Sequence, residues 1–198
     1  MIEAPDTILA DLQAALGAAD VAAVLLRLAD ADERALINRV KTLARSVQNP
    51  GAALLLFDRP DLVARSGADG AHLTGIDAFN AAIAHLKPER IAGAGGLASR
   101  HDAMLAAEAG ADYVMFGERD ATGHRSSFEA IIERVEWWAE VFQAPCIGFV
   151  ETPDEIAPLV MAGADFIAVG DFVFADRRGP SATLAAATER LKLAEPVQ

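Results

Sequence analysis

The sequence has little that would suit an exported or membrane-bound protein. It contains one cysteine, Cys146, so no disulfide can form within the chain and an intracellular location is favoured. No apolar run reaches the length that spans a membrane, and the first residues lack a basic region followed by an apolar stretch. From these absences we expect a soluble, cytoplasmic protein with no membrane partner.

Basic residues are scarce relative to acidic ones. The 198 residues include 17 lysines and arginines against 29 aspartates and glutamates, and the net charge is −12. Nucleic acids carry the same sign of charge, so they are not expected as partners, whereas a small anionic ligand responds to local charge and stays compatible. Hydrophobic residues make up 53% of the chain and no linker or low-complexity tract interrupts it, so we expect one folded domain over residues 1–198.

What the chain does have is a joint that it repeats three times. In each copy an alanine-rich stretch ends at a glycine and then runs through Ala-Asp into a short apolar segment; the glycines are Gly67, Gly110 and Gly163. A glycine supplies the left-handed residue that ends many helices, and a short apolar run suits a buried parallel strand. Repeated helix-to-strand joints predict an α/β fold, a TIM-type (β/α) barrel, in which chemistry lies where the strands end.

The rest of the chain fits this architecture. Apolar runs predict seven strands, near residues 24, 54, 71, 92, 114, 147 and 167. Helices are expected at Pro5–Gly17, Asp32–Val47, Pro60–Arg65, Ile76–Leu86, Ser99–Ala109, Ser126–Phe142, Pro153–Met161 and Pro180–Leu193.

A closed barrel of this type needs an eighth strand, and the deficit lies at the front of the chain. Either Met1-Ile2-Glu3 is the stub of a shortened first strand, or the strand is missing and the barrel is split there. An open barrel exposes strand edges, which a covering segment or a partner subunit could hide. We therefore expect a homodimer.

Several stretches together resemble a known family. Leu54–Ala64, which contains Asp58-Arg59, and Gly67–Leu73, which ends in His72-Leu73, are similar to the thiamine phosphate synthases and the related thiazole tautomerases. The similarity continues through residues 106–117 and 162–169. The resemblance implies a transferase of thiamine biosynthesis that joins hydroxymethylpyrimidine diphosphate to thiazole phosphate and releases pyrophosphate. The implied substrates are thus small phosphorylated molecules.

The resemblance also implies a set of site residues. Asp58 and Asp77 match the two carboxylates that bind Mg²⁺ in the family, and Arg27 and Arg59 match cationic positions near the diphosphate. His72 lies toward the end of a predicted strand and is a third catalytic candidate, with a structural hydrogen bond as the alternative. Asp58 could instead pair with one of the two arginines, and Asp77 could cap the helix that begins beside it.

Glycines near the predicted strand ends are candidates for substrate binding. The run from Gly93 through Gly95 and Gly96 fits a dinucleotide-binding pattern only formally, but its amides could bind an anion, and in the resembling family this loop lies beside the substrate. Gly148 and Gly170 belong to the last two predicted strands. The last substrate-binding candidate is His124, in a polar loop, where a solvated side chain is the alternative.

Other positions depart from the family's pattern. Ala29 stands in place of a lysine, and Phe57 in place of an asparagine. Val150-Glu151 replaces the Gly-Gly-Ile cradle that binds phosphate in the family, and Asp171 replaces a serine; carboxylates at these places repel phosphate. These departures keep an alternative open, namely a family member without synthase chemistry that binds a ligand or a partner, or that has a changed reaction.

Overall fold

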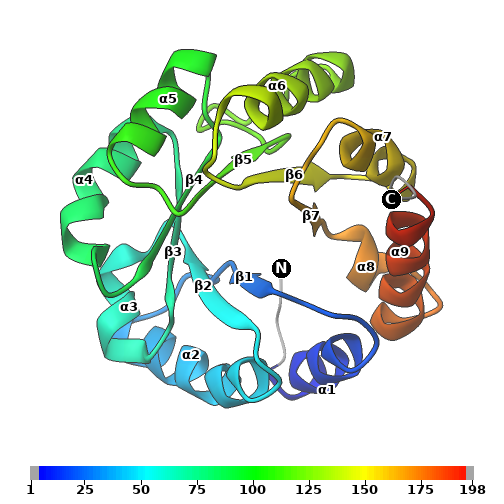
Figure 1. The fold of residues 1–198 in the computed structure, drawn as a ribbon. Coiled ribbons are helices and arrows are strands. Elements are labelled where there is room, and N and C mark those ends of the chain that lie inside the picture. Colours follow the sequence, from blue (N-terminus) through cyan, green and yellow to red (C-terminus); the bar gives the residue numbers. More distant parts are fainter. Residues whose placement is uncertain (1–4, 195–198) are drawn as a thin grey trace.

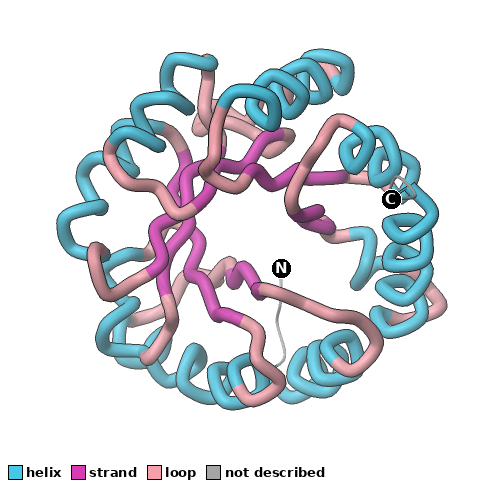
Figure 2. The backbone as a smooth tube through the Cα atoms, viewed as in Figure 1, coloured by secondary structure: helices cyan, strands magenta, loops and turns pink. Residues whose placement is uncertain are grey.

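A computed structural model, which describes residues 5–194, has the TIM-type architecture that the sequence predicts (Figure 1). The described strands are β1 (Ala23–Leu26), β2 (Ala53–Phe57), β3 (Gly70–Thr74), β4 (Ile91–Gly95), β5 (Tyr113–Phe116), β6 (Cys146–Val150) and β7 (Phe166–Val169). Every neighbouring pair is parallel, and the order in the sheet is the order in the chain. Figure 2 shows the strands curled inside a ring of helices. All seven predicted strands are confirmed.

Helices follow the strands around the outside of the sheet. They are α1 (Pro5–Leu16), α2 (Glu33–Gln48), α3 (Pro60–Ser66), α4 (Ile76–Leu86), α5 (Arg100–Glu108), α6 (Phe128–Val141), η1 (Pro153–Glu155), α7 (Ile156–Met161), α8 (Phe172–Ala175) and α9 (Pro180–Ala194). The helix expected over Pro153–Met161 divides into the 3₁₀ turn η1 and α7. The four-residue helix α8 was not expected, because so short a segment shows no periodicity. None of the described helices is long and apolar enough to cross a bilayer.

The barrel is open along one seam. β1 and β7 are the two edges of the sheet and do not pair with each other in the part of the chain that the structure describes (Figure 1). The expected stub Met1-Ile2-Glu3 lies outside the described residues. Two large apolar side chains in the last strand and the helix after it are exposed. Phe166 at the start of β7 is 48% accessible, and Phe174 in α8 is 54% accessible.

The three Gly-Ala-Asp joints close in the same way. Gly67, Gly110 and Gly163 have left-handed φ angles of 80°, 101° and 94°, as a helix end of this kind requires. The aspartate that follows pairs with both backbone groups of one residue in the preceding strand. In the last joint the Asp165 amide donates to the Cys146 carbonyl at 3.0 Å, and the Cys146 amide donates to Asp165 Oδ2 at 2.8 Å. The other joints repeat both bonds, Asp69 with Leu54 and Asp112 with Ala92.

Each joint aspartate therefore makes, with the first residues of the preceding strand, the two backbone hydrogen bonds that a longer neighbouring strand would otherwise make. We expect Asp165→Ala to lower the free energy of unfolding by about 1 kcal/mol, because the Cys146 amide loses its acceptor while water can reach the vacated position from the exposed side. Urea unfolding monitored by circular dichroism measures the loss. Asp165→Asn is the matched variant, since its side-chain oxygen can still accept, and it should unfold near the wild-type midpoint. Equal losses in both variants would contradict this role.

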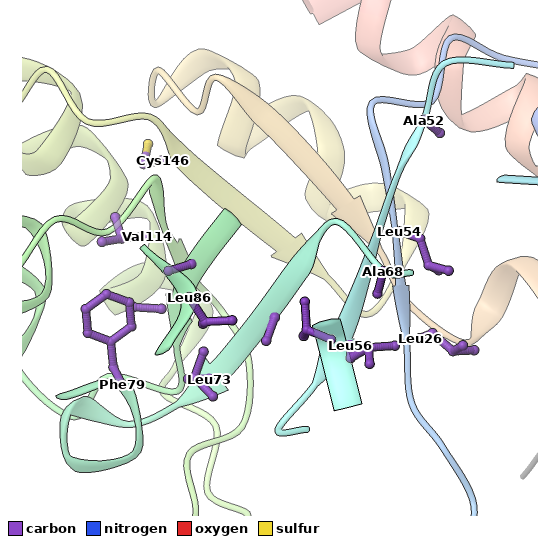
Figure 3. Packing of buried hydrophobic residues seen from close by; sticks show 14 of the residues in the cluster. Leu26, Ala52, Leu54, Leu56, Ala68, Leu73, Phe79, Leu86, Val114 and Cys146 are labelled. Carbon is purple, nitrogen blue, oxygen red and sulfur yellow. The ribbon is translucent and has the colours of Figure 1, made fainter. Parts of the chain in front are cut away.

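The core has two layers, one between the strands and the helices and one inside the barrel. Alternate residues of the strands, among them Leu54, Leu56 and Val114, join the larger cluster with Phe79 of α4 (Figure 3). The side chains between them, Leu55, Tyr113 and Met115, form the smaller cluster. This alternation is the two-residue period of a strand whose two faces are both covered. It directs the intervening side chains of β3 and β4 toward the barrel axis.

Cys146 lies in the outer layer and is fully buried. Burial raises the pKa of its thiol to about 11. Since the thiolate is the reactive form, the native protein should resist a thiol-specific reagent at pH 8, where about one thiol in a thousand is ionised. Ellman's reagent should release one equivalent of chromophore per chain only after denaturation. Rapid release from the folded protein would contradict the buried position.

Candidate functional site

The first part of the candidate site is built around Asp58, directly after β2. Asp58 has a φ of 50°, a left-handed conformation that aspartate tolerates better than most residues. Two hydrogen bonds hold it there, because its amide donates to the His72 carbonyl at 2.9 Å and its Oδ1 accepts from the Thr74 amide at 2.7 Å. The residue is exposed, so the carboxylate is fixed at the end of β2 and open to a ligand. Asp77, also exposed, lies in the first turn of α4, after the next strand.

The two candidate arginines are held near Asp58 by other partners. The Arg27 guanidinium lies over the Phe57 ring, with 3.9 Å from its Cζ to the ring centroid, so the residue that departs from the family's asparagine serves as its platform. Arg59 donates to both carboxylate oxygens of Asp61, at 2.9 and 2.7 Å. This pairing raises the pKa of Arg59 and lowers that of Asp61. The alternative in which Asp58 pairs with an arginine is wrong for the described structure.

His72 lies in the middle of β3 with its side chain inside the barrel and is fully buried. Its Nε2 is 2.7 Å from Glu118 Oε2, and its Nδ1 is 2.9 Å from the Tyr113 hydroxyl. Because a carboxylate only accepts, the hydrogen-bond network assigns the Nε2 proton to the bond with Glu118 and leaves Nδ1 to accept from the phenol. Burial, followed by the negative charges of Glu118 and Asp112, raises the pKa of Tyr113, which keeps that phenol a donor.

Sequence reasoning did not identify Glu118 or Tyr113 as partners of His72. The structural hydrogen bonding that was the alternative for His72 is present, and a catalytic role for His72 stays a prediction. One signal was available, because two strand glycines make room for this network. A Cβ at Gly93 would overlap the Tyr113 ring, and a Cβ at Gly95 would overlap Glu118 Oε2 and His72 Nε2.

The other candidate glycines have different surroundings. Gly96 has a φ of 56°, and a Cβ there would lie 2.6 Å from the Thr74 methyl group. Gly148 faces outward, because a Cβ there would lie 2.9 Å from Leu159 of α7. The Gly170 amide donates to the Val150 carbonyl at 3.2 Å, so it is used within the sheet. The anion-binding role remains a prediction for all five candidate glycines.

A cavity of about 160 Å³ lies beside β5, between the loop that follows β4 and the loop that follows β5. It brings together the sequence candidates Gly96 and His124 with the unexpected Glu118 and Arg134. The Glu118 side chain is 8% accessible, and the hydrogen bond to His72 uses its Oε2, which leaves Oε1 with no hydrogen-bond partner among the described residues. This cavity therefore offers one fixed carboxylate oxygen to a ligand.

The loops after β5 and β6 are joined by an ion-pair cluster that the sequence did not predict. Arg125 donates from both terminal nitrogens to the two oxygens of Glu155, at 2.9 and 2.8 Å. Glu155 also accepts the Glu151 amide at 2.8 Å, and the Glu151 carboxylate pairs with Arg119 at 2.9 Å. Burial alone would raise the pKa of Glu155, but Arg125 and the backbone amides outweigh it and lower the pKa below its usual range.

The chain is similar in sequence to proteins of one family over most of its length. The family model described as thiamine monophosphate synthase matches residues 2–173. A protein named thiamine-phosphate synthase from Rhodospirillum centenum is 42% identical over 184 residues, which cover 91% of this chain and 89% of the relative. One of the same name from Hyphomonas neptunium is 37% identical over 182 residues, covering 88% and 82%.

Solved structures share the fold at lower identity. The structure named thiamine phosphate pyrophosphorylase from Pyrococcus furiosus superposes with a TM-score of 0.77 and 20% identity, covering 94% of this chain and 90% of that one. The structure named native KDPGal superposes with a TM-score of 0.74 and 17% identity. At these identities the superpositions bear on the fold alone.

Proposed function

This chain belongs to the thiamine monophosphate synthase family, and from that premise we propose that it forms the bond between the two rings of thiamine. In the proposed reaction a thiazole ring nitrogen attacks the methylene carbon of hydroxymethylpyrimidine diphosphate. A carbon–nitrogen bond forms, the carbon–oxygen bond breaks, and pyrophosphate leaves with the bonding electrons. The observation that carries the proposal is the fixed, exposed carboxylate of Asp58 at the end of β2, within a family match that covers most of the chain.

The donor set at this end of the barrel suits Mg²⁺. Asp58 and Asp77 would hold the ion, which would neutralise charge on the leaving diphosphate. Within residues 5–194 no group of three or more histidine, cysteine, aspartate or glutamate side chains could hold a metal ion. Magnesium is often bound by one or two carboxylates together with substrate phosphates and water, so Asp58 and Asp77 would supply the protein's share of the ligands.

The neighbouring residues have separate proposed roles. Arg27, whose guanidinium lies over the Phe57 ring, presents positive charge toward the diphosphate. Arg59 is paired with Asp61 and would contact the diphosphate by sharing its guanidinium between the two anions. His72 acts as a positioning residue, because it fixes Glu118 at the edge of the cavity. Glu118 would then accept hydrogen bonds from a substrate amino group.

The test is pyrophosphate release by the full chain, combined with calorimetric titration of the pyrimidine diphosphate with and without Mg²⁺. We expect micromolar binding of the diphosphate that requires Mg²⁺, and pyrophosphate release that requires a thiazole acceptor. Absence of both would count against the synthase function.

A second candidate function has one observation in its favour. At the end of β6, where a phosphate would need free backbone amides, the Glu155 carboxylate accepts the Glu151 amide. A family member that has lost synthase chemistry, and that binds a ligand or a partner, would tolerate this arrangement. Diphosphate binding without pyrophosphate release, with any thiazole acceptor, would favour this second function.

We also propose a cytoplasmic homodimer. The exposed side chains of Phe166, in the unpaired edge strand β7, and of Phe174, in the helix α8 that follows it, favour burial against a second copy. Light scattering coupled to size-exclusion chromatography should give twice the chain mass. Phe166→Lys should shift the protein to the monomer mass if this seam is the interface.

A further inference from the structure

The carboxyl ends of the last two strands are where many barrels bind phosphate, through backbone amides of the loops that follow. In this chain a carboxylate of the protein already occupies such a position after β6. Glu155 folds back so that its Oε2 lies 2.8 Å from the Glu151 amide nitrogen. Its side chain is 14% accessible, so the carboxylate lies within the structure and is mostly shielded from water.

The cation beside Glu155 is Arg125, and it also has its partners within the protein. Arg125 is 12% accessible, and its Nε donates to the Gly117 carbonyl at 2.7 Å. Its two terminal nitrogens donate to the two oxygens of Glu155, and one of them also lies 3.4 Å from the Phe149 carbonyl. The guanidinium therefore has its strong contacts within the protein, and the charges of Arg125 and Glu155 cancel.

The loop after β7 offers a phosphate few contacts, since Arg177 is its one arginine without a carboxylate partner among the described residues. The Gly170 amide donates to the Val150 carbonyl, and the next residue is the exposed Asp171. Arg178 is paired with Asp176 at 2.7 Å. A phosphate dianion entering here would meet Glu151 and Asp171 and would have to displace Glu155 from both an amide and a guanidinium.

We propose that the acceptor of this protein is the thiazole alcohol rather than its phosphate ester, and that Glu155 is the specificity-determining residue; this inference rests on the proposed synthase function. The Glu155 carboxylate takes the place of the acceptor's phosphate, so an uncharged hydroxyethyl group fits where a dianion is repelled. The bonds formed and broken are those given above, pyrophosphate is still the leaving group, and the product is thiamine without a phosphate.

The experiment supplies the full chain with Mg²⁺, the pyrimidine diphosphate and one acceptor at a time. Pyrophosphate release gives kcat/KM, and mass spectrometry identifies the product. We expect kcat/KM for the thiazole alcohol to exceed that for thiazole phosphate by about tenfold or more. A preference for the phosphate ester would overturn the inference and leave the proposed function intact. If neither acceptor supported pyrophosphate release, both the inference and the proposed function would be overturned.

Two variants test Glu155 itself. Glu155→Gly frees the Glu151 amide and Arg125, and Glu155→Gln removes the charge but keeps a side chain that can accept the same hydrogen bond. Each should raise kcat/KM for thiazole phosphate by about tenfold relative to that for the alcohol, and calorimetry should detect tighter binding of thiazole phosphate. Asp154→Asn is the matched control, because Asp154 is the adjacent acid, is 86% accessible and, within residues 5–194, forms an ion pair with Arg190 alone. An unchanged preference in both folded variants, verified by thermal melting, would overturn the role of Glu155.

Discussion

Asp58→Asn should lower kcat/KM for pyrophosphate release by about a hundredfold or more, because the change removes one of two carboxylates that would hold Mg²⁺ against the diphosphate. The variant is chosen to preserve the local backbone. Asparagine tolerates the left-handed φ of 50° that Asp58 adopts, and its side-chain oxygen can still accept the Thr74 amide. We therefore expect a lower kcat/KM and a higher Mg²⁺ concentration for half-maximal rate, with little change in the free energy of unfolding.

The control for Asp58→Asn is Glu108→Gln, which removes one negative charge from the exposed end of α5. This control changes the net charge by the same amount, and Glu108 lies at the end of α5 that is remote from the carboxyl ends of the strands. It should leave both kcat/KM and the Mg²⁺ dependence at the wild-type values. If Asp58→Asn behaved like this control in both measurements, Asp58 would not be a metal ligand.

The parts of the fold that could be predicted from the sequence are those specified by local chemistry. Gly67, Gly110 and Gly163 end their helices in the left-handed conformation, and the aspartates two residues later complete the joints. Each joint combines a steric rule with an apolar run, so the order of strands and helices could be inferred without distant contacts. Helix α8 is the exception, since it contains a single turn.

The candidate site could be predicted only where its residues lie close together in the sequence. Asp58 and Arg59 were proposed because Leu54–Ala64 resembles a segment of the family, and the apolar run before them placed them at the end of a strand. The bond between His72 and Glu118 joins residues 46 positions apart, and the bond between Arg125 and Glu155 joins residues 30 positions apart. No periodicity encodes such pairs, because the first depends on how β3 meets the loop after β5 and the second on how the loops after β5 and β6 meet.

The charges at the mouth divide the site into two halves. On the side of β1 to β3, Arg27 and Asp58 are exposed and available to a metal and its anionic ligand. On the side of β5 and β6, Arg125 is neutralised by Glu155, and Arg134 in the cavity beside β5 donates only to backbone carbonyls among the described residues. The proposed pair of ligands, one diphosphate and one uncharged acceptor, matches the neutralised charge after β6 and the exposed charges after β1 and β2.

The bond between His72 and Glu118 also requires that Gly95 has no side chain. Gly95→Ala should lower the free energy of unfolding by about 3 kcal/mol, the upper end of the range for overpacking a core. The new Cβ would overlap Glu118 Oε2 and His72 Nε2, and His72 cannot move aside because it is stacked between Phe57 and Tyr113. The substitution should also abolish the binding of any ligand that Glu118 orients, which calorimetry with the pyrimidine diphosphate would detect.

A thermodynamic cycle separates this cause from a general effect of alanine. Gly17→Ala is the matched substitution, because a Cβ there meets only the Gln13 and Ala14 carbonyl oxygens at ordinary contact distances, and it should be nearly neutral. Glu118→Ala removes one of the two overlapping groups, so the double variant with Gly95→Ala should lose less stability than the sum of the single losses. Additive losses would mean that the space beside Gly95 does not serve the Glu118 carboxylate, and that His72 alone requires the glycine.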